Sequence, residues 1–156
     1  MHHIRLAAAT ALVAALACLP SQAASPQQLE QRAHAAERAG HMDEASMLYQ
    51  AAVVANPART QSYIALAQFY ARHDEYHLAH KYFAEALYLN PKLITALGGS
   101  GKTDLALGNR ASAEDDLARL RHICGGRCPE EQELAAALSA QSVAKAGGSK
   151  ASLDKR

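Results

Sequence analysis

The chain has 156 residues, of which 36 are alanine and only eight are aromatic. A β-sandwich or barrel needs β-branched and aromatic residues at a period of two, whereas alanine at this density favours closely packed helices. Sixteen basic and 15 acidic residues give a formal net charge of +1, and the sequence contains no basic block. The composition therefore predicts an all-α domain. It gives no electrostatic reason to expect nucleic acid as a partner.

The N-terminal segment 1–23 has the pattern of a secretory signal peptide. Arg5 places a positive charge near the start, residues 6–19 are uncharged and almost all apolar, and residues 21–23 offer a cleavage site before Ala24. A membrane-spanning helix needs about 20 apolar residues, so this shorter stretch favours a cleaved signal over a retained anchor. The sequence predicts an exported protein, located in the bacterial periplasm, with no membrane span after cleavage.

Cleavage would remove Cys18, an alternative site of lipid attachment, and leave the pair Cys124 and Cys128. An even pair of cysteines in an exported chain most simply forms a disulfide, because the destination is oxidising. Alternatively, His122 and the two cysteines supply three soft ligands for copper or zinc. At the level of the sequence both interpretations of this pair stay open.

The sequence repeats at the interval that separates Pro57 from Pro91. At this shift, small residues align with small residues and aromatic residues with aromatic residues. The aligned pairs are Ala33 with Ala67, Ala45 with Ala79, Tyr49 with Phe83, Ala52 with Ala86 and Pro57 with Pro91. Two antiparallel helices approach closely only where small side chains cross, and proline ends the second helix of each unit. We expect helical hairpins at 26–59 and 60–93, a weaker third at 94–127, a capping helix at 129–143 and a flexible tail at 144–156.

The unit at 60–93 resembles a tetratricopeptide repeat (TPR). The residues that carry the resemblance stand at the signature positions of that family: Tyr63, Leu66, Ala67, Tyr70, Ala79, Phe83, Ala86 and Pro91. The first unit departs from the pattern at Leu29 and Arg32, and the third departs at Asp104, where an aromatic residue is expected. The resemblance covers residues 26 to 143 and extends more loosely to small exported proteobacterial members. It implies an α-solenoid of about three helix-turn-helix repeats plus a C-terminal capping helix.

This resemblance also implies a function, because the first helices of stacked repeats line a concave groove that holds a peptide or a partner helix. We therefore expect a non-enzymatic scaffold or adaptor that needs no cofactor and binds an unidentified protein. The inward positions that the family pattern gives are Glu30, His34, Glu37, Arg38, Ile64, Gln68, Arg72, Lys102 and Leu105.

Two further patterns suggest small-ligand chemistry. The run from Gly98 to Thr103 is similar to a phosphate-binding loop, but that motif needs a first glycine where Ala96 stands, so we do not expect nucleotide binding. His73, His77 and His80 are spaced so that three imidazoles can share one helix face, which makes this cluster another candidate for copper or zinc. The repeat register favours surface histidines instead, because it places His73 in a turn.

Overall fold

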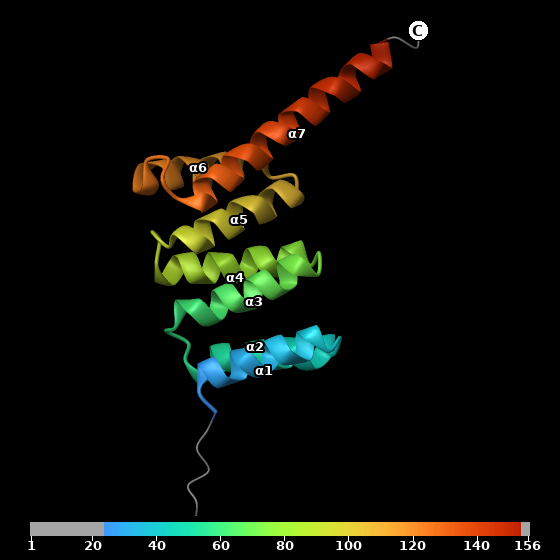
Figure 1. Ribbon diagram of the computed structural model, residues 1–156. Coiled ribbons are helices and arrows are strands. Elements are labelled where there is room, and N and C mark those ends of the chain that lie inside the picture. The colour runs from blue at the N-terminus through green and yellow to red at the C-terminus, as the bar shows by residue number, and fades with distance from the viewer. Residues whose placement is uncertain (1–23, 154–156) are drawn as a thin grey trace, which may run out of the picture.

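The computed structural model describes residues 24–153, and the predicted signal segment lies outside them. Within this range the chain forms seven α-helices and no strand (Figure 1). The helices are α1 (Pro26–Arg38), α2 (Met42–Ala55), α3 (Thr60–Arg72), α4 (Tyr76–Leu89), α5 (Ile94–Ala106), α6 (Arg110–Cys124) and α7 (Pro129–Leu153).

Consecutive helices pair into three hairpins, α1 with α2, α3 with α4 and α5 with α6, which stack along one axis (Figure 1). The first helices begin at Pro26, Thr60 and Ile94, which are evenly spaced in the sequence. This arrangement confirms the predicted all-α solenoid. The final helix α7 packs on α5 and α6 and continues to Leu153, well beyond its expected end at 143. The expected mobility of residues 144–156 stays a prediction.

The three hairpin turns share a left-handed backbone position. Gly40, Asp74 and Gly108 recur at the same interval as the helices and have φ values of +82°, +60° and +82°. Glycine adopts this conformation without steric cost, and Asp is among the few other residues that tolerate it. The repeat is therefore encoded in its turns as well as in its helices.

Small side chains lie where the helices of a hairpin cross. Ala33, Ala45, Ala67 and Ala79 are fully buried, and Tyr49 and Phe83 fill the seams between hairpins with at most 1% of their surface exposed. Both rings belong to a core cluster built mainly from the first two hairpins, while the third hairpin and α7 supply most of a second cluster around leucines. Both clusters have the small-and-large alternation that close helix packing requires.

The glycine-rich run at Gly98–Lys102 lies inside α5 and does not form a loop. A Cβ atom on Gly99 would overlap the ring of Phe83, and one on Gly101 would lie 2.5 Å from a methyl group of Leu134. These glycines let α5 approach α4 and α7 closely. Because a phosphate-binding loop needs backbone N–H groups free at a turn, this helical geometry also removes the support for nucleotide binding.

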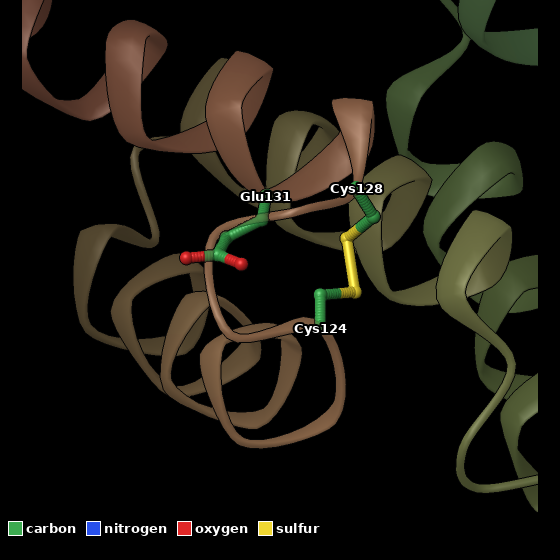
Figure 2. Close-up of side chains that lie close together, drawn as sticks. All are labelled: Cys124, Cys128 and Glu131. Atoms are coloured by element: carbon green, nitrogen blue, oxygen red, sulfur yellow. A yellow bond between two sulfur atoms is a disulfide. The ribbon is translucent and has the colours of Figure 1, made fainter.

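Cys124 ends α6 and Cys128 stands directly before α7, so the pair brackets the turn between these helices (Figure 2). Their sulfur atoms lie 2.16 Å apart, at disulfide distance, and their Cα atoms 5.6 Å apart. Gly125 closes α6 in the left-handed conformation and Gly126 repeats it, which reverses the chain within a few residues. Among the described residues, no helix combines the length and the apolar character that a membrane crossing requires.

Candidate functional site

A groove runs along α3, α5 and the first turns of α7. It contains a cavity of about 540 Å³, to which these three helices contribute most of the lining, with two residues from α4. Three of the predicted groove residues, Gln68, Arg72 and Lys102, lie on its wall. The stacking of successive hairpins thus brings together side chains that are far apart in the sequence.

The groove has an apolar floor between charged rims. Phe83 and Gly99 form part of the floor, where the missing glycine side chain allows the aromatic ring to approach. On one rim Lys102 Nζ donates to Glu133 Oε2 at 2.8 Å, and both side chains are about half exposed. An exposed ion pair of this kind contributes little to stability, so both partners are available to a ligand.

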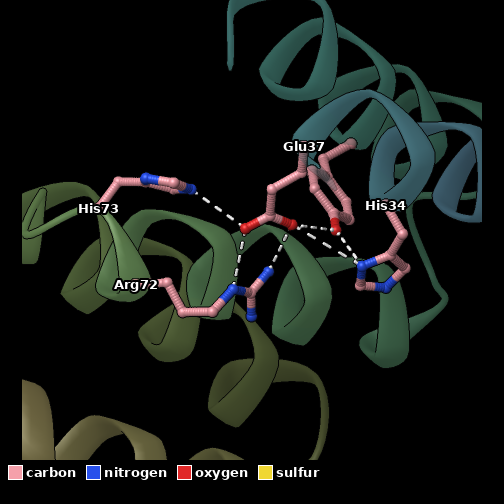
Figure 3. Close-up of polar contacts among 5 residues, drawn as sticks. His34, Glu37, Arg72 and His73 are labelled. Atoms are coloured by element: carbon pink, nitrogen blue, oxygen red, sulfur yellow. Dashed lines mark hydrogen bonds and ion pairs between the residues drawn. The ribbon is translucent and has the colours of Figure 1, made fainter. Parts of the chain in front are cut away.

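Arg72, another charged residue of the lining, is held in place by Glu37 of α1 (Figure 3). Its Nε and Nη2 atoms donate to the two carboxylate oxygens at 2.9 and 2.8 Å, a bidentate pair that fixes the plane of the guanidinium group. Tyr49 donates to the same carboxylate at 3.1 Å, and Nε2 of His73 lies 3.1 Å from it. The cluster joins α1 and α2 to α3 and so links the first two repeats.

The carboxyl group of Glu37 titrates far below its ordinary range. Burial by itself raises its pKa, but hydrogen bonds from Arg72, His73 and Tyr49 and the charge of Arg72 outweigh burial and lower the pKa from 4.5 to about 2. Burial also raises the pKa of the Tyr49 hydroxyl, and the neighbouring Glu37 charge adds to this effect. At neutral pH the site therefore holds an ionised Glu37 and a neutral Tyr49.

The outer part of α1 forms a second, open hollow beside this cluster, lined by Gln31, His34, Glu37, Arg38 and Arg72. The Nδ1 atom of His34 lies 2.6 Å from the Tyr49 hydroxyl and donates to it, because the single hydroxyl proton goes to Glu37, and the His34 side chain is half exposed. Arg38 is exposed. Arg72 lies on the walls of both this hollow and the main groove, so it connects the two surfaces.

The structure places three predicted groove residues elsewhere. Ile64 is only 1% exposed and belongs to the aromatic core cluster, and Leu105 packs partly buried against the leucine cluster. Glu30 accepts from Ser62 Oγ at 2.7 Å and pairs with Arg59, which commits its carboxylate to the contact between repeats. The rotation of each helix about its axis decides these outcomes, and a repeat pattern specifies that rotation only approximately.

Sequence reasoning missed the wall that α7 contributes. Glu130 and Glu133 line the groove from this helix, and Tyr76, Thr95 and Thr103 complete it from α4 and α5. The predicted capping helix could have indicated this wall, because a helix that stacks on the last hairpin takes the position of the first helix of a further repeat.

The structure gives carboxylate neighbours to two of the histidines that were candidates for a metal site. Nδ1 of His80 lies 3.1 Å from Asp104 Oδ1 without the angle of a hydrogen bond, while His73 binds Glu37. In the described part of the chain, the single group of three potential ligands is Cys124, Cys128 and Glu131 (Figure 2). His122, the third member of the alternative ligand set, is exposed on α6 and outside this group.

A family profile described as the cilia and flagella-associated protein 70 middle TPR-like domain matches residues 29–155. The match covers most of the sequence, and the hairpin geometry agrees with it. The chain belongs to this family of TPR-like domains. No curated protein sequence matches the chain.

Several solved TPR structures share the fold. The first TPR domain of Spaghetti (RPAP3), bound to the HSP90 peptide SRMEEVD, is 21% identical with a TM-score of 0.65, covering 76% of this chain and 94% of that one. The type III secretion translocator chaperone SycD of Yersinia enterocolitica has the same identity and TM-score, with 77% and 93% covered. The Arabidopsis OM64 TPR domain is 15% identical with a TM-score of 0.65, and 75% and 96% are covered. At these identities the likeness establishes the fold alone.

Proposed function

We propose that this TPR protein is a non-enzymatic scaffold or adaptor that binds a segment of another protein in the groove between α3, α5 and α7. The observation that carries the proposal is the 540 Å³ cavity, which has an apolar floor and lies along the first helices of successive repeats. A cavity of this size accommodates a few side chains, since sites for small ligands fall in the range of about 300–1,000 Å³. The partner therefore presents a short segment, extended or helical.

The charged residues that line the groove indicate which side chains the bound segment of the partner carries. Arg72 and Lys102 are basic, Glu130 and Glu133 are acidic, and all four line the same cavity. An apolar side chain would enter the floor near Phe83, while flanking charges of both signs on the partner would pair with the rims. Two solved relatives support binding of this kind, since one is described with an HSP90 peptide and SycD with a peptide of the translocator YopD.

A selected peptide tests the groove. Peptides chosen from a displayed library against the native protein should bind the double variant Gln68→Ala/Lys102→Ala at least about tenfold more weakly, because it removes two polar contacts from the wall. The matched control is Gln61→Ala/Lys92→Ala, whose two side chains are exposed and outside the cavity. Calorimetric titration measures both affinities. Equal affinity for the two double variants would place the binding surface elsewhere.

We further propose that the protein acts after export, in the bacterial periplasm, as a small exported proteobacterial TPR protein. The uncharged N-terminal stretch and the cysteine pair at disulfide distance support this location. The intact mass of the protein from its native cell tests it. A chain that begins at Ala24 and gains about 2 Da on reduction is the expected result, and a full-length chain with free thiols contradicts it.

A further inference from the structure

The turn between α6 and α7 gathers three ligand atoms outside the groove. The sulfurs of Cys124 and Cys128 and one carboxylate oxygen of Glu131 all lie within 4.8 Å of one another. Cys124 comes from the last turn of α6 and Glu131 from the first turn of α7, and the Glu131 carboxylate lies beside the turn that links the two cysteines (Figure 2). The fold thus positions these groups from two helices that pack against each other.

Glu131 is a buried carboxylate without a basic partner. The residue is 8% exposed, and its Oε2 atom accepts from the backbone N–H of Gly126 at 2.7 Å. Among the described residues, no ion pair and no hydrogen bond involve its Oε1 atom. Within the same described range, Oε1 is not one of the fully buried atoms that lack a hydrogen-bond partner, so solvent reaches it. This oxygen therefore remains available to a metal ion, while the positive end of α7 favours the ionised carboxylate.

We propose that the reduced protein binds one zinc ion through Cys124 Sγ, Cys128 Sγ and a carboxylate oxygen of Glu131, with water as the fourth ligand, and that the disulfide form does not. Two thiolates and a carboxylate form a donor set that Zn²⁺ accepts, and three protein ligands plus water complete a tetrahedron. In the disulfide each sulfur's bonding electrons are shared with its partner, so the oxidised pair is no longer a thiolate ligand.

The chemical change between the two states is a thiol–disulfide exchange. A dithiol reductant supplies two electrons and two protons, the Cys124–Cys128 bond breaks, and the reductant's own thiols become a disulfide. Zinc then replaces the two thiol protons, which are released to solvent. Occupation of the site is therefore controlled by the redox state of the cysteine pair.

The local geometry permits this change without moving the helices. Two sulfur ligands at about 2.3 Å from a tetrahedral zinc ion lie about 3.8 Å apart. After the disulfide bond is broken, the two sulfurs therefore need to move apart by less than about 2 Å to coordinate zinc. Rotation about the Cα–Cβ bonds supplies this distance across a Cα–Cα separation of 5.6 Å. Gly125 and Gly126, both in the left-handed region, give the enclosed turn additional freedom.

Calorimetric titration of the native protein with Zn²⁺ tests the proposal in both redox states. The reduced protein should bind one ion with a Kd below about 1 µM, and the oxidised protein should bind at least about 100-fold more weakly. Glu131→Gln should weaken binding to the reduced protein at least about tenfold. Glu133→Gln is the matched control, because Glu133 lies on the same helix, is exposed and pairs with Lys102.

Cobalt provides a readout that does not depend on the stability of a variant. Co²⁺ added to the reduced wild-type protein should give the thiolate charge-transfer absorption and the intense visible bands of a tetrahedral site. Cys124→Ser/Cys128→Ser should lose the charge-transfer absorption. The proposal is overturned if the reduced protein binds neither metal, if the oxidised protein binds zinc equally well, or if Glu131→Gln binds zinc as tightly as Glu133→Gln.

Discussion

Glu37 serves two neighbouring repeats with one carboxylate. It lies on α1, yet it fixes Arg72 on the rim of the main groove and accepts a hydrogen bond from the buried Tyr49 of α2. The side chain is 14% exposed, so it is largely shielded but still reached by solvent. A single ionised group therefore couples the stability of the first repeat to the orientation of a candidate binding residue.

The low pKa of Glu37 predicts acid sensitivity. Because the folded-state pKa of about 2 lies below the ordinary value of 4.5, its contribution is present above about pH 4.5 and is lost as pH falls toward 2. We expect Glu37→Gln to lower the free energy of unfolding by about 1–2 kcal/mol at neutral pH, after allowance for solvent screening. In acid the stabilities of the variant and the wild type should differ less.

Urea unfolding of the wild type and of Glu37→Gln at several pH values between 7 and 3 measures the difference in their free energies of unfolding. A single carboxyl group with a lowered pKa can contribute a difference of this size. Glu44→Gln is the control, since Glu44 lies on α2, is about half exposed and pairs with the exposed His41. A stability difference that stays constant across this pH range would contradict the assigned role of Glu37.

At the scale of the element, α5 is shaped by what packs against it. The three glycines Gly98, Gly99 and Gly101 disfavour a helix by about 1 kcal/mol each relative to alanine. Their lack of a side chain is needed for packing, because added Cβ atoms would overlap Glu130, the Phe83 ring and Leu134. The same glycines that weaken α5 locally thus make room for α4 and α7 and for the floor of the groove.

Alanine substitutions at these glycines distinguish the gain in helix propensity from the steric cost of an added Cβ atom. Gly99→Ala should destabilise the protein by about 1–2 kcal/mol, because the overlap with the buried, rigid ring of Phe83 outweighs the gain in helix propensity. Gly101→Ala should cost less, since the conflicting atoms are the terminal methyl groups of Leu134, which are at the end of a flexible side chain. Chemical denaturation ranks the two variants, and a Gly99→Ala protein as stable as the wild type would refute the packing argument.

The whole molecule is a linear stack in which each hairpin depends on its neighbours. Among the described elements, α1 and α2 contact each other and otherwise only α3, whereas the central hairpin has a packed neighbour on each side. In such a stack, stability is roughly the sum of terms within repeats and terms between adjacent repeats. Within residues 24–153, the first hairpin has one interface, with α3, and it includes the Glu37 cluster and the contacts of Glu30 with Arg59 and Ser62.

This asymmetry predicts the order of opening. Amide hydrogens of α1 and α2 should exchange with solvent faster than those of α3 and α5, because the end hairpin can open without the rest. Glu37→Gln should accelerate exchange in α1 and α2 further and leave α6 unchanged. Mass spectrometry of peptides after timed exchange measures both effects, and uniform exchange along the chain would exclude independent opening of the first repeat.

The sequence by itself determined the helical class, the interval of the repeat and the three hairpins, because these follow from local signals. Alanine at the crossings, proline after Asn56 and Asn90, and a left-handed residue in each turn act over a few residues. It also indicated Gln68, Arg72 and Lys102 as groove residues, since each stands at an inward position of a first helix.

Only the tertiary structure decided which of the other candidates reach the groove. Small rotations of the helices bury Ile64 and commit Glu30 to Arg59, although both fit the inward pattern. The stacking of α7 adds Glu133 to the groove wall and brings Glu131, in place of His122, beside the cysteine pair. These juxtapositions depend on how helices cross, and crossing geometry is set by packing between distant residues, which a local pattern does not encode.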